Sequence, residues 1–252
     1  MKKTLLIALT LVLAQITVSA QMRADAYYHT DEMPNAVNYL PPPPDSVNAA
    51  FAYDMSQYFW GKSIRDTERG AMAIADADCG IDHLCEIFSE PFGLELSEEN
   101  TPAIYLMLSN AISTANKGSS KCKNYYKRVR PFQLYNEPVA SGETLSQTSY
   151  PSGHTLRGWV MALLLVEING DNQDAVLQRG YEFGQSRVIV GAHWQSDVNA
   201  GRVVGGACFA RLHNSPEFRA EMAAAQAEYY EITGKTPDES LMPYTTDSED
   251  EE

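Results

Sequence analysis

Residues 151–170, with the sequence PSGHTLRGWVMALLLVEING, decide the fold class of this 252-residue chain. Residues 155–168 are strongly apolar and contain no proline, so they predict a helix. The pair Asn169-Gly170 is a good helix stop, because both residues tolerate the left-handed backbone that ends many helices. A turn with proline, serine and glycine stands directly before the helix. The centre of the chain is therefore predicted to be helical.

Helical patterns continue on both sides of this stretch. Asp45 or Ser46 can cap a first helix, and Pro216 and Gly234 are placed to begin and end the last one. Strand-like alternation is scarce, and no internal repeat is evident. We predict a single all-α domain over residues 46–234, a bundle of roughly eight or more helices with little or no sheet. The further helices are expected at residues 45–60, 63–78, 98–117, 121–129, 174–190, 196–212 and 216–233.

The N-terminus has the pattern of an export signal. Lys2 and Lys3 precede an apolar stretch at residues 4–18, and Val-Ser-Ala at 18–20 fits the small-x-Ala cleavage pattern. A buried or membrane-spanning helix is the alternative, but the apolar stretch is short for a span. We expect residues 1–20 to be removed near Ala20. The mature protein is then expected in the periplasm or secreted, without a membrane anchor.

Two further segments flank the predicted domain. Residues 21–45 contain four consecutive prolines at 41–44, which predict an extended lead-in that wraps a surface. A recognition peptide for another domain is the alternative use of such a run. Residues 235–252 form an acidic tail that we expect to be solvated and disordered.

The charge balance argues against one class of partner. The formal net charge is −14, and loss of Lys2 and Lys3 with the signal would make it −14 − 2 = −16. A field of that sign does not attract nucleic acid. The cysteines would meet an oxidising compartment, and their spacing does not fit a metal site. Three pairings are open among Cys79, Cys85, Cys122 and Cys208.

Basic residues are concentrated in one short stretch of this acidic chain. Five of them lie within residues 121–130, with no acid among them. Lys123 and Arg130 are seven residues apart, about two helical turns, so we expect them to lie on one helix face. Lysine offers a point charge and arginine a planar fork that suits phosphate oxygens. The alternative is an ordinary solvated helix face.

A second segment, Pro-Ser-Gly-His at 151–154, stands at the start of the central helix. Unpaired backbone N–H groups and the helix dipole favour an anion there. Gly153 lets the backbone approach an anion closely, and Ser152 adds a hydroxyl donor. The alternative is a simple capped turn with a surface His154.

The third segment combines Arg187, His193 and Asp197. If His193 opens a helix, the i,i+4 spacing brings the Asp197 carboxylate toward its ring. A carboxylate on one ring nitrogen leaves the other free as base or nucleophile. A purely structural His–Asp pair is the alternative. The chain lacks the Gly-x-Ser-x-Gly elbow, the P-loop and the His-Glu-x-x-His motif, so those chemistries are disfavoured.

Taken in order, the three segments read Lys-x6-Arg-Pro, Pro-Ser-Gly-His and Ser-Arg-x5-His-x3-Asp. This order resembles the three-part motif of bacterial non-specific acid phosphatases, type-2 phosphatidic acid phosphatases and vanadium haloperoxidases. The chain is most similar to the exported class A acid phosphatases, over about residues 38–230. It departs from them at Thr148, where that group usually has glycine, and in its acidic tail. The matching motif positions are Lys123, Arg130, Pro131, Pro151, Ser152, Gly153, His154, Ser186, Arg187, His193 and Asp197.

The resemblance implies hydrolysis of a broad range of phosphate monoesters, with vanadate as an inhibitor. It implies that His193 attacks phosphorus to form a phosphohistidine while Asp197 orients its ring. His154 would protonate the leaving alcohol and then help to activate water. No metal and no other cofactor is implied. The phosphate oxygens would be held by Lys123, Arg130, Ser152, the Gly153 N–H and Arg187.

Other functions remain to be weighed against this one. A vanadium haloperoxidase would use the same residues to hold vanadate, but the class A similarity and the modest length favour the phosphatase. The missing spans disfavour a phosphatase embedded in the bilayer. Two histidines and an orienting carboxylate are superfluous for a protein that only binds phosphate. We expect small phosphomonoesters and inorganic phosphate as ligands, and a homo-oligomer. The preferred ester and any transfer of phosphate to alcohols are left open.

Overall fold

The computed structural model describes residues 27–146 and 148–236. The predicted export signal and most of the acidic tail lie outside this range, so the structure says nothing of them. The described chain folds into helices α2 to α11 with two short 3₁₀ helices, and it contains no strand. The prediction of an all-α fold is confirmed.

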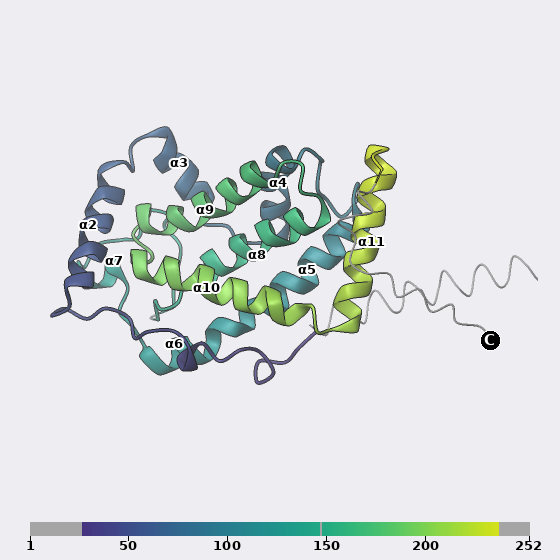
Figure 1. The fold of residues 1–252 in the computed structure, drawn as a ribbon. Coiled ribbons are helices and arrows are strands. Elements are labelled where there is room, and N and C mark those ends of the chain that lie inside the picture. Colours follow the sequence, from purple (N-terminus) through teal and green to yellow (C-terminus); the bar gives the residue numbers. More distant parts are fainter. Residues whose placement is uncertain (1–26, 147, 237–252) are drawn as a thin grey trace, which may run out of the picture.

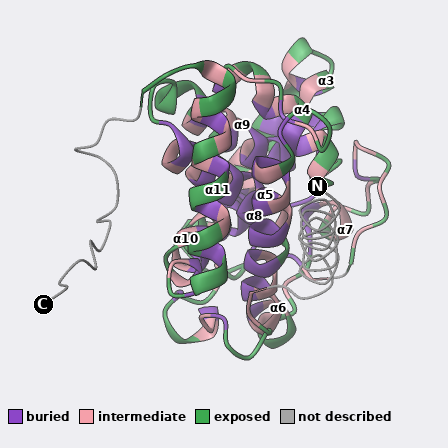
Figure 2. Ribbon diagram, turned by 90° about the vertical axis from the view of Figure 1, so that its right-hand side faces the viewer, coloured by how far each residue is buried: buried purple, intermediate pink, exposed green. Residues whose placement is uncertain are grey.

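Helix α8 (Gly153–Ile168) lies at the centre of the bundle. It packs against α9 (Gln173–Ile189), α10 (Gln195–Leu212) and α5 (Pro102–Asn116), as Figure 1 shows. Most of its apolar residues are buried, and Figure 2 shows the centre of the bundle, where α8 is labelled, largely in the purple of buried residues. A helix that is apolar on nearly all sides has to be covered on all sides, so the sequence of α8 fixes its central position.

The remaining helices cover this core. Helix α11 packs on α5, while α2, α3 and α4 pack against α9 (Figure 1). Their bounds are η1 (Ala36–Asn38), α2 (Ala49–Ser63), α3 (Glu68–Ala75), α4 (Ile81–Phe92), η2 (Lys117–Ser119), α6 (Ser120–Tyr126), α7 (Pro131–Leu134) and α11 (Pro216–Thr233).

Helix α4 was not predicted from the sequence. Its first residue follows Gly80, which supplies no side-chain cap, and Pro91 lies within its last turn. Both residues normally signal a break in a helix. Four buried side chains nevertheless hold α4 in the core, namely Leu84, Cys85, Phe88 and Phe92.

Other helix boundaries also differ from the prediction, and α5, for example, begins at Pro102, four residues later than expected. Asn48 caps α2, whereas the predicted cap Asp45 accepts a hydrogen bond from the Val47 N–H in the preceding turn. Helix α3 begins five residues later than expected, after its cap Thr67. Helix α6 ends at Tyr126 because Lys127 adopts a left-handed backbone with φ of 46°.

The four prolines at 41–44 form an extended segment without regular structure. It runs beneath the bundle in Figure 1 and leads into α2. The Pro41 carbonyl accepts a hydrogen bond from the Tyr150 hydroxyl at 2.8 Å, and the Pro44 carbonyl accepts one from Arg128 Nη2 at 3.2 Å. The lead-in therefore wraps the surface next to two of the predicted phosphate-binding segments.

All four cysteines are free thiols in the structure. None of the three pairings that the sequence allowed is formed. Burial raises the pKa of Cys85 and Cys208 to about 12 and that of Cys122 to about 11. Thiols with such values stay protonated and weakly reactive, so these three act as small core residues.

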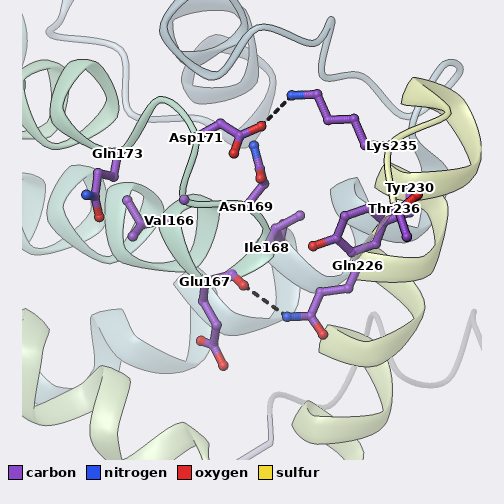
Figure 3. Close-up of a pocket in the computed structure, with 11 residues that line it drawn as sticks. Val166, Glu167, Ile168, Asn169, Asp171, Gln173, Gln226, Tyr230, Lys235 and Thr236 are labelled. Carbon is purple, nitrogen blue, oxygen red and sulfur yellow. Dashed lines mark hydrogen bonds and ion pairs between the residues drawn. The ribbon is translucent and has the colours of Figure 1, made fainter. Parts of the chain in front are cut away.

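A hollow of about 570 Å³ lies between the C-terminal ends of α8 and α11 (Figure 3). Lys235 and Asp171 form an ion pair of 2.6 Å beside it, and the Gln226 amide donates to the Glu167 carbonyl. Because the sixteen residues of α8 span about 24 Å, this hollow is remote from the start of α8. None of the described helices has the length and apolar character needed to span a membrane.

Candidate active site

The N-terminus of α8 forms one wall of the candidate site. Ser152 caps the helix by accepting a hydrogen bond from the Thr155 N–H at 3.2 Å, and its own N–H donates to the Asp197 carbonyl at 2.9 Å. Thr155 Oγ1 also donates to the Ser152 hydroxyl, which keeps its own proton for another acceptor. A Cβ on Gly153 would lie only 3.3 Å from Asn116 Oδ1, and it would make an ordinary contact of 3.7 Å with the Lys123 side chain. Lys123 therefore lies next to the unpaired N–H groups of the helix start, where an anion is favoured.

Lys123 and Arg130 do not share a helix face, contrary to the sequence-based prediction. Helix α6 ends between them, and Arg130 is the extended residue before Pro131, as a residue that precedes proline prefers to be. The two side chains still converge on one point. Lys123 Nζ donates to the Thr148 carbonyl at 3.3 Å, and Arg130 Nη2 donates to the same oxygen at 3.0 Å. Thr148, where the similar proteins usually have glycine, acts here through its backbone.

Burial weakens the proton affinity of both cations. It lowers the pKa of Lys123 to about 8, with the nearby Arg130 acting in the same direction. It also lowers the pKa of Arg130 to about 10, with Arg187 as a second cation that adds to the effect. A cluster of partly desolvated cations of this kind is unfavourable until an anion joins it.

His193 lies at the centre of these groups. Its Nε2 is 2.9 Å from Arg130 Nη1, and because a guanidinium only donates, Nε2 must accept. Its proton is therefore on Nδ1, which is 3.4 Å from Asp197 Oδ2 and 3.3 Å from the Ser149 hydroxyl. Burial lowers the pKa of His193 well below its usual value, and Arg130 and Lys123 lower it further. The ring is a neutral imidazole whose unprotonated nitrogen faces the cations.

The Asp197 carboxylate is buried and held by several donors. Its Oδ2 accepts from the Trp194 N–H at 2.8 Å and from the Ser149 hydroxyl. Its Oδ1 accepts from Arg128 Nη1 at 2.6 Å. This arrangement fixes the carboxylate against the His193 ring.

Arg128 has a role that sequence reasoning missed. Its Nη2 donates to the fully buried Asp54 at 2.7 Å, so one guanidinium joins Asp54 of α2 to Asp197 of α10. Asp54 also accepts from the N–H and hydroxyl of Ser196 at 2.8 and 2.6 Å. The concentration of basic residues was the available signal, but only packing shows that Arg128 serves the carboxylate rather than an anion.

His154 projects from the first turn of α8 and is not a surface residue. Its Nε2 is 2.6 Å from the Asp76 carbonyl, which only accepts, so Nε2 carries a proton and Nδ1 is left for a ligand. The ring stacks on Phe183 with centroids 4.7 Å apart. Burial lowers the pKa of His154 well below its usual value, and the charge of Arg187 acts in the same direction.

Asp76 at the end of α3 supports His154 from behind, and sequence reasoning did not single it out. Its carboxylate accepts from the Ser186 hydroxyl at 2.6 Å and from Arg179. The motif residue Ser186 thus anchors α3 to α9 instead of facing the anion site. The Asp76 carbonyl that receives His154 is held in place by these contacts.

Arg187 is almost fully buried and incompletely paired. Its Nη2 forms an ion pair with Glu143, a residue of the segment between α7 and α8. Its Nε and Nη1 are buried and find no hydrogen-bond partner among the residues that the structure describes. Buried guanidinium donors of this kind call for an acceptor, and a tetrahedral oxyanion supplies several.

Four of the predicted residues are linked by contacts, and the charge of Arg187 acts on both His193 and His154. Lys123 adjoins Gly153, Lys123 and Arg130 meet at Thr148, and Arg130 contacts His193. Such a site can bind a tetrahedral oxyanion among cations and backbone donors, with an unprotonated imidazole nitrogen on one side. These are the groups that nucleophilic attack on a phosphate ester requires.

Known proteins with similar sequences include phosphatases, in agreement with a site that can bind a tetrahedral oxyanion. The model of the PAP2 superfamily matches residues 102–220, which include all three motif segments. A non-specific acid phosphatase of Providencia stuartii is 42% identical over 218 residues, which cover 83% of this chain and 87% of that protein. The chain belongs to the bacterial non-specific acid phosphatases of the PAP2 superfamily.

Other members of this family match to a similar extent. A non-specific acid phosphatase of Salmonella typhi is 40% identical, covering 89% of this chain and 91% of that protein. An acid phosphatase of Zymomonas mobilis is 32% identical, with 89% and 86% coverage. The family similarity extends over nearly the whole described bundle, including the helices on which the candidate site is built.

Proposed function

We propose that this protein is an exported acid phosphatase that hydrolyses a broad range of phosphate monoesters through a phosphohistidine intermediate, without a metal ion. Membership of the bacterial non-specific acid phosphatases supports phosphatase activity of the PAP2 type. The observation that carries the mechanism is the neutral His193, whose Nε2 accepts from Arg130 within a cluster of cations.

In the first step, His193 Nε2 attacks phosphorus as the bond from phosphorus to the ester oxygen breaks. Before this attack, Arg130 must shift its N–H from His193 Nε2 to a phosphate oxygen, which frees the Nε2 lone pair. The positive charge that develops on the ring is balanced by Asp197 next to Nδ1. Lys123, Arg187 and the start of α8 stabilise the oxygens of the transition state.

His154 is the proposed proton donor to the leaving alkoxide. Its Nε2 proton is committed to the Asp76 carbonyl, so the transferred proton must sit on Nδ1. The acid is therefore the imidazolium form, which the low pKa of His154 confines to acidic pH in the free enzyme. A bound phosphate dianion would raise that pKa and extend the active range upward.

In the second step, water attacks the phosphohistidine and releases inorganic phosphate. His154, now neutral, takes a proton from this water and returns to its starting state. The positive charge that a metal ion often supplies in phosphoryl transfer would come here from Lys123, Arg130 and Arg187. The sequence pattern of residues 1–20 supports export to the periplasm or beyond.

Hydrolysis of p-nitrophenyl phosphate across pH, with and without EDTA, tests the proposal. We expect activity that is highest at acidic to near-neutral pH, unaffected by EDTA and blocked by vanadate, which mimics five-coordinate phosphorus. Loss of activity in EDTA that added divalent metal restores would contradict the metal-free mechanism. Absence of activity under all conditions would contradict the phosphatase itself.

A further inference from the structure

Arg187 differs from the other two cations of the site, Lys123 and Arg130, because its side chain forms an ion pair with Glu143. Lys123 and Arg130 are held by neutral groups, the Thr148 carbonyl for both and the Ser146 carbonyl for Arg130 Nε at 2.6 Å. A phosphate oxygen can replace a neutral carbonyl as the acceptor, because the hydrogen bond that is lost is weaker than the charged one that forms. Arg187 instead carries a charged hydrogen bond to a carboxylate, and bonds of that kind are roughly twice as strong as neutral ones.

Glu143 differs from the acids Asp197 and Asp76 in the cation that it contacts. Asp197 has Arg128 as its partner, and Asp76 has Arg179. Glu143 is therefore the carboxylate whose partner is one of the predicted phosphate ligands. The Glu143 carboxylate occupies Nη2 of Arg187 and leaves Nε and Nη1 without a partner among the described residues. A phosphate that binds to Nε and Nη1 would therefore share the guanidinium with the Glu143 carboxylate.

The backbone around Glu143 is anchored on both sides. Ala140 donates to the Val190 carbonyl at 2.9 Å, which ties the segment to the end of α9. Ser146 receives Arg130 Nε on the other side. These contacts keep the Glu143 carboxylate near Arg187, and its side chain is mostly buried, with 20% exposed.

We propose that Glu143 competes with phosphate for Arg187 and so sets the affinity of the site for phosphate. In the empty site its carboxylate occupies part of the guanidinium. When a phosphate dianion binds, the two anions repel each other across the shared cation. Glu143 thereby weakens binding of the dianion and of the product, inorganic phosphate, and speeds product release. This inference rests on the proposed function, because it assumes that Arg187 binds phosphate.

The test is calorimetric binding of inorganic phosphate at pH 7 to the wild type, Glu143→Gln and Glu137→Gln. Glu137 is the matched control, because it belongs to the same segment but pairs with Lys62 and the Tyr58 hydroxyl. Coupling between two binding events on one protein is typically about 5-fold or more in affinity. We expect Glu143→Gln to lower the Kd for phosphate at least about fivefold, and Glu137→Gln to leave it unchanged. An equal or higher Kd for Glu143→Gln would overturn the inference.

Thermal unfolding provides an independent readout. Without Glu143, Arg187 is a buried cation without its anion, so the Tm of Glu143→Gln should fall in phosphate-free buffer. Phosphate should then raise the Tm of this variant more than that of the wild type, because a tighter ligand stabilises more. An equal rise in both proteins contradicts the inference.

A second variant covers the case in which Glu143→Gln folds poorly. Glu143→Asp keeps the charge but withdraws it from Arg187 by one methylene, and its Kd should lie below that of the wild type. An unchanged Kd contradicts the inference. The two proposals fail in different ways: a wild type that neither binds phosphate nor hydrolyses p-nitrophenyl phosphate refutes the function. A wild type that does both, with unaltered binding by the Glu143 variants, refutes only the role of Glu143.

Discussion

Arg128 Nη1 donates to Asp197 Oδ1 at 2.6 Å, so the carboxylate that orients the proposed nucleophile is itself held by an arginine outside the phosphate site. The same guanidinium reaches Asp54 in α2. Two buried acids on separate helices thus share one buried cation. Since Asp197 Oδ2 is occupied by Ser149 and the Trp194 N–H, the carboxylate is left with one orientation, which suits the His193 ring.

Removal of this arginine should destabilise the fold. Arg128→Gln leaves Asp54 and Asp197 as buried charges without a cation, and loss of one partner of a buried pair costs about 3–5 kcal/mol. Lys62→Gln is the matched control, because it breaks an exposed pair with Glu137 that is worth about 0–1 kcal/mol. Urea unfolding of both variants measures the difference. Equal losses in the two variants would show that Arg128 does not anchor the acids.

The two histidines should differ in their dependence on the leaving group. His193→Ala removes the nucleophile and should abolish turnover of every ester. His154→Ala removes the acid, which typically contributes about 10²–10⁴-fold, and p-nitrophenolate needs little protonation to leave. The variant should therefore lose far more activity on an alkyl phosphate than on p-nitrophenyl phosphate in phosphoenzyme formation, measured by rapid quench. Similar losses on both esters would refute the role of His154, and phosphoenzyme in His193→Ala would overturn the nucleophile assignment.

Phosphate affinity should fall as the pH rises through the pKa of Lys123. Because burial lowers this pKa to about 8, the side chain is a cation below that pH and becomes neutral above it. Each pH unit above the pKa should cost up to about tenfold in affinity for inorganic phosphate. Lys123→Arg keeps its charge and should remove the decline between pH 7 and 9. The same decline in both proteins would assign it to another group.

The mature protein should begin near Gln21. The apolar stretch and the Val-Ser-Ala pattern at 18–20 motivate this expectation. N-terminal sequencing of protein from the native host, fractionated into periplasm, medium and membranes, is the direct measurement. Retention of Met1 on a membrane-bound protein would contradict both the cleavage and the localisation.

The sequence by itself determined the fold class and most of the residues of the candidate site. An apolar segment such as 155–168 has to be buried on all sides, and periodicity and caps located most of the other helices, because these signals act between residues close in the chain. Spacing likewise predicted that Asp197 would reach His193, although His193 does not open the helix but lies two residues before α10 begins at Gln195. The motif residues could be recognised in the sequence, because the chemistry that each can perform depends on its residue type.

Tertiary structure alone decided which groups support that chemistry. Arg128 meets Asp54 and Asp197 across 74 and 69 residues, and Asp76 meets Ser186 across 110. Lys123 and Arg130 converge by way of a helix end and the Thr148 carbonyl, not along one helix face. Glu143 reaches Arg187 from a segment without a helical pattern. Local propensity does not encode such contacts, because they arise only when packing of the helices brings distant side chains together out of water.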